Sequence, residues 1–520
     1  MRIKVLAIFL VVISCVTAGC VPKDSAERHL SHALDFVELQ MLKEADIEVR
    51  NALRIKENDK RYNEQAEGFL LRSISYVFEG ENKKAIRELE AGLKKHESYW
   101  NVYPLLASLY MREGEYDKAI VLLRKMPNRD FGDTQLKIAE GLEYSKKDFN
   151  GQALKYYESA KEEFSGQSLQ FNEDSGMLKV VRNGTFSILY DLLATAYEKT
   201  NELSKALENY ENLEKISPQF PQIMQKIAIV KYKIELKNNP KNAAVLNSLG
   251  WQYYQIGERE KAAIAYKTAI KNDHSLSIAF NNLGLVHYDR DEFNEAASSF
   301  NRAITLNNDN SAKMYALYNL GRIFRRKKEY QKAVNCFEQA MKINPSYGPA
   351  LKEFNIAMLL LMIRSDSKSV TLGELGDAYY NNQELAPAIK IYEEIAKKRT
   401  ANFQVYFNLG QIYFTKQIYD RAQKNYQKVI LIKPANWQAH KALANLHYVK
   451  KEYKKALVEI EKALSDSPGS SVFDIKNQKA YIYFEMGQNK DAIAVWKEIL
   501  NDAEGQCANK IKKIIKVLES

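Results

Sequence analysis

The chain has 520 residues and carries 76 Lys and Arg against 65 Asp and Glu, so its formal net charge is +11 at pH 7. Gly (22) and Pro (11) make up about 4% and 2% of the residues, below the usual ~7% and ~5%, which favours long helices. The positive charge is spread along the chain without a zinc knuckle, an RNA-recognition strand pattern or a basic arm, so we expect no nucleic-acid partner. Four cysteines are too few for a disulfide framework, and Cys336 and Cys507 are predicted to be unpaired.

Residues 1–20 are predicted to be a targeting segment rather than part of the fold. Arg2 and Lys4 precede an apolar run from Val5 to Val16, which is too short for a comfortable transmembrane helix. The next residues, Thr17-Ala18-Gly19-Cys20, resemble the cleavage box of bacterial lipoproteins, although Thr17 stands where that family prefers Leu. The resemblance implies a lipoprotein signal peptide at 1–19, acylation (palmitate) of Cys20, and a tether at 20–25. An ordinary secretory signal cleaved near Ala18 is the alternative.

The lipoprotein resemblance also implies a location. Val21 after the cysteine, rather than Asp, resembles lipoproteins that are sorted to the outer membrane. We therefore expect a protein of the bacterial cell envelope, attached to the membrane by its N-terminal lipid and facing the periplasm from the outer membrane. The inner membrane is the alternative.

Residues 26–220 are predicted to form a first array of five helical hairpins with an insertion at 165–186. The insertion is polar and carries Gly166, Gly176 and Gly184, which suits a small hairpin of strands or a disordered loop. Residues 221–242 are predicted to be a bridging segment, with one helix from Ile223 to Leu236 that is ended by Asn239-Pro240.

A repeated pattern is clearest between Ala243 and Ile343. The first copy has Leu249-Gly250 followed by Ala262, Tyr266 and Ala269. The equivalent residues are Leu283-Gly284 with Ala296, Phe300 and Ala303, and then Leu320-Gly321 with Ala333, Phe337 and Ala340. Small residues stand where two helix backbones approach closely, and one large ring fills each hairpin. The first two copies are 34 residues apart, a period typical of a helix-turn-helix solenoid.

These residues resemble the tetratricopeptide repeat (TPR) family. The resemblance implies an all-α superhelical solenoid of about twelve hairpins in two arrays, since such a hairpin cannot bury its apolar face alone and must stack. The second array is predicted at 243–506, with seven hairpins and a half-repeat at 348–368, and residues 507–520 are predicted to be a C-terminal capping helix. The apolar run of the half-repeat is interpreted as buried, and an exposed Met-rich patch for a partner is the alternative.

In TPR proteins the first helices line a concave groove, and the family's register can be carried onto this chain. The twelfth position of each repeat in the second array then holds Tyr254, Tyr288, Arg325, Tyr380, Phe414, Tyr448 and Phe484. The sixth position holds Asn282, Asn319 and Asn408, among others. This resembles the asparagine ladder with which some TPR proteins hold the backbone of an extended peptide. The alternative is that the aromatic residues pack between repeats and the asparagines cap or solvate helices.

Arg322 and Arg325 share the groove face of one repeat in this register. They are either an anion clamp for a carboxylate-bearing partner or part of a solvated turn.

No region remains for a catalytic domain, and no phosphate loop, nucleophile elbow or zinc-protease motif is present in the sequence. We therefore expect neither an enzyme nor a cofactor or metal. His29 and His32 lie three residues apart on one helix face, but the nearby sequence offers no obvious third ligand.

The sequence as a whole predicts a lipid-anchored scaffold that binds other envelope proteins. We expect an extended protein segment in the groove of the second array, serving the assembly or export of an envelope system. A polysaccharide-binding or exopolysaccharide-export solenoid and a type IV pilus assembly lipoprotein stay open as alternatives.

Overall fold

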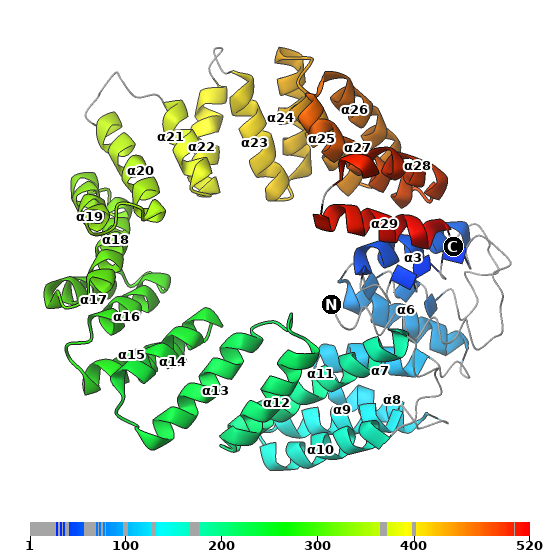
Figure 1. Cartoon of the computed structure of the whole chain (residues 1–520), viewed down its shortest axis with the longest axis horizontal. Helices are drawn as coiled ribbons and strands as arrows, with labels where there is room; N and C mark the ends of the chain where they lie inside the picture. Colours follow the sequence, from blue (N-terminus) through cyan, green and yellow to red (C-terminus); the bar gives the residue numbers. More distant parts are fainter. Residues whose placement is uncertain are drawn as a thin grey trace. The chain divides into compact units, whose positions relative to one another are not determined.

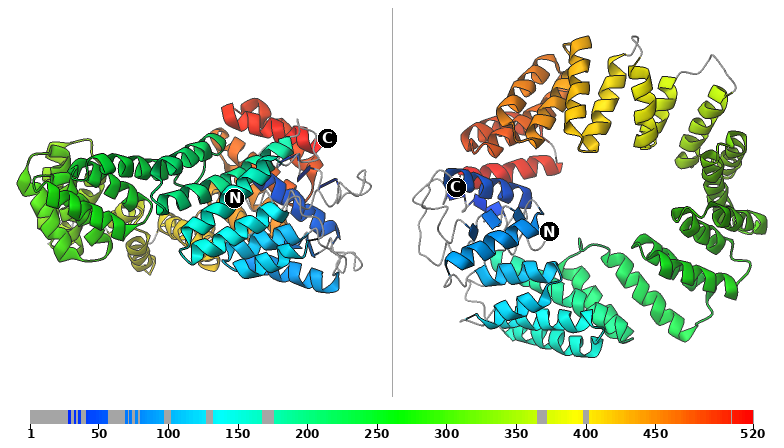
Figure 2. Two further views of the ribbon diagram at one scale, coloured as in Figure 1. Left: turned by 90° about the horizontal axis from the view of Figure 1, so that it is seen from below. Right: turned by 180° about the vertical axis from the view of Figure 1, so that it is seen from behind.

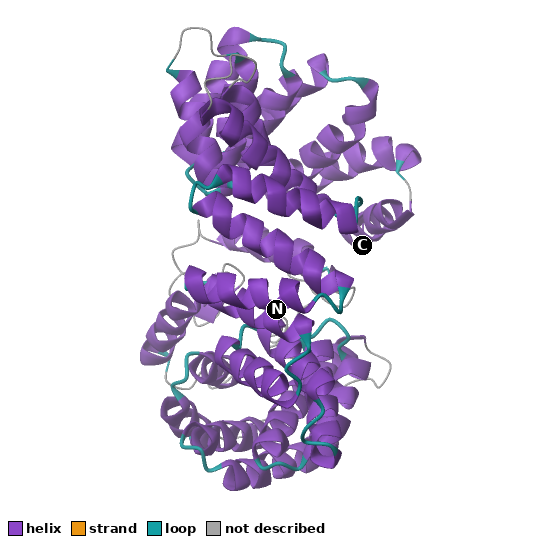
Figure 3. Cartoon of the chain, turned by 90° about the vertical axis from the view of Figure 1, so that its left-hand side faces the viewer, coloured by secondary structure: helices purple, strands orange, loops and turns teal. Residues whose placement is uncertain are grey.

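The computed structural model describes residues 28–29, 32–33, 35–36, 41–56, 69–70, 72–73, 76–77, 80–96, 102–126, 132–166, 176–364, 372–397, 402–503 and 505–519. The regular structure within these ranges is helical throughout and includes no strand (Figure 3). Successive helices pack against one another along the chain as repeated hairpins (Figure 1). The prediction of an all-α solenoid of helical hairpins is confirmed.

The chain divides into two compact units. Unit 1 comprises residues 1–223 and 468–520, and unit 2 comprises residues 224–467. The helices of unit 1 are α3 (Leu42–Lys56), α6 (Asn82–Lys95), α7 (Tyr103–Arg112), α8 (Tyr116–Arg124), α9 (Gly132–Lys146), α10 (Asn150–Gly166), α11 (Gly176–Lys199), α12 (Leu203–Ile216), α27 (Gly469–Glu485), α28 (Asn489–Ile499), the short 3-10 helix η2 (Leu500–Asp502) and α29 (Gly505–Glu519).

The helices of unit 2 begin with α13, which starts at the boundary between the units. They are α13 (Ile223–Asn238), α14 (Ala243–Gln255), α15 (Arg259–Asn272), α16 (Ser277–Asp289), α17 (Phe293–Leu306), α18 (Asn310–Arg326), α19 (Tyr330–Ile343), α20 (Gly348–Arg364), α21 (Leu372–Asn381), α22 (Leu385–Ala396), α23 (Phe403–Thr415), α24 (Tyr419–Ile432), α25 (Trp437–Val449) and α26 (Tyr453–Asp466).

The repeated small and large residues form the core of each hairpin, as the sequence predicts. Ala262, Tyr266 and Ala269 of α15 are completely buried, and the equivalent residues of α17 and α19 are buried to the same extent. The ring of Tyr266 lies against the backbone of α14, because a Cβ atom at Gly250 would stand only 2.7 Å from its Cε1 atom. Glycine at this position therefore lets the two helices of a hairpin approach each other.

Several first helices of unit 2 begin at a side-chain cap. The Asn242 side chain accepts a hydrogen bond from the Val245 backbone N–H at 3.2 Å, and Asn436 accepts one from Ala439 at 2.8 Å. Such a cap satisfies one of the backbone donors that a helix start leaves unpaired.

The predicted insertion at 165–186 is shorter than the sequence indicates. Helix α10 ends at Gly166 and α11 begins at Gly176, so the second half of the insertion is helical rather than a pair of strands or a loop. Phe186 of α11 packs against Phe164 of α10, with ring centroids 5.2 Å apart, and this contact attaches α11 to the preceding hairpin. Residues 167–175 lie outside the described residues.

The half-repeat predicted at 348–368 is the single helix α20. Ile356 and Ala357 are completely buried. Phe354 and Met358 pack against the core of α19, while Leu359 and Ile363 pack against the core that begins at α21. The apolar run thus joins two neighbouring repeats, which favours the buried interpretation over an exposed Met-rich patch.

The two ends of the chain pack together within unit 1, a contact that the predicted second array at 243–506 and the predicted cap at 507–520 did not include. Helices α27 and α29 lie beside α3 (Figures 1 and 2). Phe484, predicted to face a groove, is completely buried between Phe36 and Trp496, at ring-centroid distances of 6.0 and 5.8 Å. The final helices join the N-terminal repeats because both carry apolar faces that exclude water when they meet.

Polar contacts accompany this core. Arg50 forms an ion pair with Glu485, with 2.9 Å between Nη1 and Oε2, and Asn51 Nδ2 donates to the Phe484 carbonyl oxygen at 3.0 Å. Glu44 of α3 accepts a hydrogen bond from the Tyr481 hydroxyl at 3.0 Å. It also pairs with Lys510 of α29 at 2.8 Å. Helix α29 therefore packs on α28 and also contacts α3, which comes from the opposite end of the chain.

Candidate binding surface on the first helices

The first helices of successive hairpins in unit 2 contact one another, as α14 does with α16 and α16 with α18. Each second helix packs against the first helix of its own hairpin and that of the next. The first helices therefore share one face. We call it the first-helix face and define it by Asn247, Trp251, Tyr254, Asn281, Asn282, Tyr288, Asn319, Arg322 and Arg326.

A chain of amide hydrogen bonds runs across this face. Asn282 Nδ2 donates to Asn247 Oδ1 at 3.0 Å, and Asn281 Nδ2 donates to Asn282 Oδ1 at 3.1 Å. Asn319 Nδ2 then donates to Asn281 Oδ1 at 3.3 Å. Arg322 Nη1 donates to Asn319 Oδ1 at 3.4 Å. The amides thus connect three consecutive first helices, α14, α16 and α18.

These asparagines are buried, which limits what they offer to a partner. Asn281, Asn282 and Asn319 are only 2%, 6% and 4% exposed. Each already uses its amide within the chain, and a buried amide without a partner would be costly. In this structure the asparagines hold neighbouring repeats in register.

Asn408, the third predicted ladder residue, is buried in the same way. Its Nδ2 atom donates to the Tyr392 hydroxyl at 2.9 Å and to Asp377 Oδ1 at 3.3 Å. Its Oδ1 atom accepts from Gln404 Nε2 at 2.8 Å. This amide has no contact to Asn282 or Asn319, so the three predicted residues do not form one ladder.

Tyr254 belongs to an aromatic and charged group at the end of α14. Its ring stacks on Trp251 at 5.5 Å, and the Arg259 guanidinium lies 4.2 Å from the ring centroid. Its hydroxyl donates to Asp289 Oδ2 at 2.9 Å. Burial, followed by the hydrogen bond to Asp289, raises the pKa of Tyr254 to about 12. Trp251 is 37% exposed, so an indole face is available at this point.

Tyr288 occupies the equivalent position on α16, and two arginine side chains lie close to its ring. The guanidinium carbons of Arg322 and Arg326 lie 4.4 and 5.1 Å from its ring centroid. Arg322 also lies 5.6 Å from the ring of Tyr318. Arg326 pairs with Asp291 at 3.0 Å, whereas Arg322 forms no ion pair within the described part of the chain.

The other aromatic residues predicted for the twelfth position also pack within their own hairpins. The Tyr288 ring meets Phe293 at 5.6 Å, Phe414 meets Tyr419 at 5.8 Å, and Tyr448 meets Tyr453 at 6.0 Å. Tyr380 packs against the core that contains Leu375 and Tyr379. In each ring pair the partner lies five residues later, across the turn, because the first helix ends there and the second begins. These rings close hairpins. Tyr288 is buried, and Tyr380, Phe414 and Tyr448 are half-buried.

Arg325 was predicted to be part of an anion clamp for a partner, but it is paired with carboxylates of its own chain. Its guanidinium pairs with Glu353 of α20 at 2.7 Å and with Glu384, just before α22, at 2.8 Å. Burial opposes the charge, but the two carboxylates outweigh it and raise the pKa of Arg325. Arg325 therefore joins three segments of its own chain, and Arg322 is the arginine left on the first-helix face.

The sequence reasoning missed Asn247 and Asn281 as members of the amide chain. Both stand at the fifth position of their repeats, immediately before the sixth position, and the repeat register places the fifth position on the same face. Glu353 and Glu384 were missed because no repeat relates them to Arg325. Cys20 lies outside the described residues. Among the helices that are described, none is both long enough and apolar enough to span a bilayer.

Comparisons with known proteins agree with the repeat architecture. Family models described as "Tetratricopeptide repeat" match residues 275–346 and 403–436. No curated protein gives a significant match.

The chain is similar to several solved structures. One is a tetratricopeptide repeat protein from Parabacteroides merdae, which is 16% identical and has a TM-score of 0.24. The match covers 54% of this chain and 99% of that protein. MamA protein is 22% identical over 42% of this chain and 98% of its own, with a TM-score of 0.23. The Cut9-Hcn1 hetero-tetramer of APC/C is 15% identical over 87% and 96%, with a TM-score of 0.24. The family models and the repeated helical hairpins agree, and the chain contains tetratricopeptide repeats at residues 275–346 and 403–436.

Proposed function

We propose that this protein is a non-enzymatic scaffold of the bacterial envelope whose first-helix face in unit 2 binds an extended, carboxylate-bearing segment of another protein. Tetratricopeptide repeats are in general protein-interaction modules, which supports a protein partner. The finer assignment rests on one observation, the environment of Arg322.

Arg322 combines a fixed position with an unused charge. The rings of Tyr288 and Tyr318 both lie close to its guanidinium, and Asn319 accepts one of its N–H groups, so the side chain is held in place. It forms no ion pair within the described residues, although the neighbouring Arg325 and Arg326 both do. A guanidinium that is positioned but unpaired suits a carboxylate or acidic side chain of a partner. The exposed indole of Trp251, on the same face, would take an apolar side chain of the same segment.

The asparagines have a supporting part in this proposal. Because Asn281, Asn282 and Asn319 are buried and paired, changing them to alanine would disturb the register of the repeats as well as any contact with a partner. A surface substitution is therefore the sharper test of binding.

The experiment is an in-cell crosslinking pull-down of the tagged protein from the envelope fraction. We compare wild type, Arg322→Gln and Trp251→Ala with two matched controls on second helices of the same array. Arg302→Gln removes an exposed arginine of α17 that also lies near a ring, Phe280, and Ile264→Ala removes a 65% exposed side chain of α15.

We expect a protein partner that is captured by wild type and both controls and is lost from Arg322→Gln and Trp251→Ala. Equal capture by all five proteins would refute the assignment of the first-helix face. Displacement of the bound partner by a glycan, but not by an acidic peptide, would refute a peptide-binding face and favour the polysaccharide alternative.

The envelope location is proposed from Cys20 alone. We infer that Cys20 is acylated and anchors the chain to the membrane, because it follows a short apolar segment and two small residues. Several acyl chains on one residue give stable anchoring, since each buried methylene contributes about 0.8 kcal/mol and a single chain is marginal. Acyl-label incorporation is expected to be lost in Cys20→Ala and retained in Cys507→Ala, which changes an exposed cysteine. Label that persists in Cys20→Ala would contradict the anchor.

A further inference from the structure

Three side chains that could bind a metal ion meet at the N-terminal end of unit 1. His29 and His32 belong to the N-terminal segment, whose described residues 28–29, 32–33 and 35–36 are helical, and Glu48 belongs to α3. The side chains of Glu48, His32 and His29 are 0%, 4% and 12% exposed. One ligand atom from each lies within 4.8 Å of the others. The fold thus supplies the third ligand that the nearby sequence does not.

The geometry aims both imidazoles at one carboxylate oxygen. His29 Nδ1 is in direct hydrogen-bond contact with Glu48 Oε2, and His32 Nδ1 lies 3.7 Å from the same oxygen. Both ring nitrogens of His32 are buried without a hydrogen-bond partner. A buried imidazole in that state has lost its contacts with water and gained none in return, which is costly. A bound cation would give it a partner.

The carboxylate is prepared for a cation. Asn489, the first residue of α28, donates from Nδ2 to the other oxygen, Glu48 Oε1, at 3.3 Å. Such an outer hydrogen bond fixes a metal-binding carboxylate and leaves one oxygen free to coordinate.

We propose that His29, His32 and Glu48 bind one Zn²⁺ ion. Two imidazoles and a carboxylate are a known three-ligand set for zinc, which binds them at about 2.0–2.2 Å. Tetrahedral bonds of that length separate the ligand atoms by about 3.3 Å. The 3.7 Å between His32 Nδ1 and Glu48 Oε2 is close to this, and the ion replaces the direct contact between His29 and Glu48. Water takes the fourth position.

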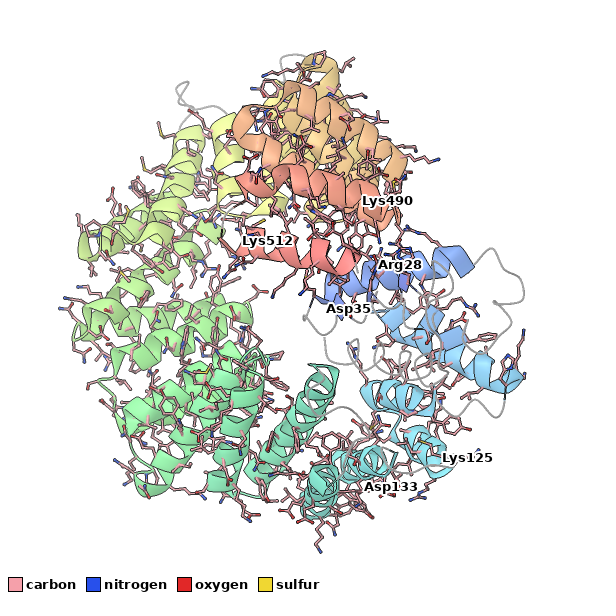
Figure 4. All side chains as sticks on the ribbon, turned by 45° about the vertical axis from the view of Figure 1, so that its right-hand side comes forward. Arg28, Asp35, Lys125, Asp133, Lys490 and Lys512 are labelled. Carbon is pink, nitrogen blue, oxygen red and sulfur yellow. The ribbon has the colours of Figure 1, made fainter. Side chains whose placement is uncertain are left out.

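The site lies where the two ends of the chain meet, so the ion has a structural part that goes beyond the proposed scaffold function. Figure 4 labels Arg28 and Asp35 on the N-terminal segment, Lys490 on α28 and Lys512 on α29, the elements around the site. The ion would fasten the N-terminal segment to α3, and α3 in turn holds α27 through Arg50 and Glu485. Metal binding would therefore stabilise the contact between the N- and C-terminal helices of unit 1.

The test uses the full purified chain, stripped with a chelator, with Zn²⁺ alone as the ligand. Binding is measured by calorimetry, and Co²⁺ is added in parallel because its visible absorption reports coordination. The variants are His32→Gln and Glu48→Gln. The matched control is His447→Gln, because His447 pairs with Glu452 at 2.6 Å in the same manner but has no third ligand among the described residues.

We expect wild type and His447→Gln to bind one Zn²⁺ with equal affinity and both site variants to bind it roughly tenfold or more weakly. Zinc should also slow hydrogen exchange in α3, α27 and α28 of wild type. No stoichiometric binding by wild type, or unchanged affinity in Glu48→Gln, overturns the proposal. If a variant loses helicity, its weaker binding could come from unfolding, and the ligands are then identified by X-ray absorption of the zinc-loaded wild type. Nitrogen and oxygen ligands with two imidazoles support the site, and a sulfur ligand overturns it.

Discussion

The close approach of the two helices in each hairpin of unit 2 can be tested by adding a single methyl group. In Gly284→Ala the new Cβ atom would lie 2.6 Å from Cε1 and 2.8 Å from Cδ1 of Phe300. Phe300 is completely buried, so its ring cannot swing into solvent. Either the ring leaves its rotamer or α16 and α17 move apart.

The expected magnitude follows from two opposing effects. Overpacking a core costs about 1–3 kcal/mol, whereas replacing glycine by alanine inside a helix returns about 0.8–1 kcal/mol. The net destabilisation should therefore be about 1 kcal/mol, or about fivefold in the equilibrium between closed and open hairpin. Phe300→Leu shortens the ring at a cost of its own but removes the atoms that clash. The double variant should consequently be less destabilised than the sum of the single variants, by about 1 kcal/mol.

Native-state hydrogen exchange is the suitable assay, because long repeat arrays do not unfold as a single two-state unit. Exchange in peptides from α16 and α17 should accelerate in Gly284→Ala and largely recover in Gly284→Ala/Phe300→Leu relative to Phe300→Leu. Gly348→Ala is the control, since nothing lies within 4 Å of a Cβ atom at that position. Slower exchange in Gly284→Ala, or strict additivity in the double variant, would refute the packing argument.

Two further predictions concern charged groups in unit 2. Arg325→Ala should destabilise α18 and α20 by about 3–5 kcal/mol, because it leaves Glu353 and Glu384 without their buried arginine partner. Hydrogen exchange in these helices should accelerate. An unchanged exchange rate would contradict the role of this arginine. Burial raises the pKa of Glu459, but hydrogen bonds from His440 and Lys462 outweigh it and lower the pKa below its usual value. The charged carboxylate therefore stabilises the folded state above the unfolded pKa, and this stabilisation is lost as the pH falls through the lowered folded pKa. Circular dichroism melts from about pH 6 to pH 3 should show this loss in wild type and less of it in Glu459→Gln; identical pH profiles would contradict it.

The contacts of the candidate binding residues were harder to predict than the fold, for a physical reason. A repeat register shows which positions share a face, and it correctly placed Tyr254, Tyr288 and Arg322 on the first helices of neighbouring hairpins. Register does not show what each side chain contacts. Asn282 and Asn319 are paired with other asparagines, and Arg325 is paired with two glutamates, because each found a partner in its own chain at short range.

The sequence by itself determined the hairpins. Their small and large residues recur at fixed spacing within a few helical turns. Local geometry is therefore sufficient to predict that two helices approach closely at Gly250, that Tyr266 fills the hairpin, and that a helix begins at Ile223. The tertiary structure alone decided that the two chain ends meet, with Arg50 and Glu485 in contact across 435 residues of sequence. It also decided that Glu48 joins His29 and His32. Such contacts depend on how apolar faces far apart in the chain find each other, and no local spacing encodes them.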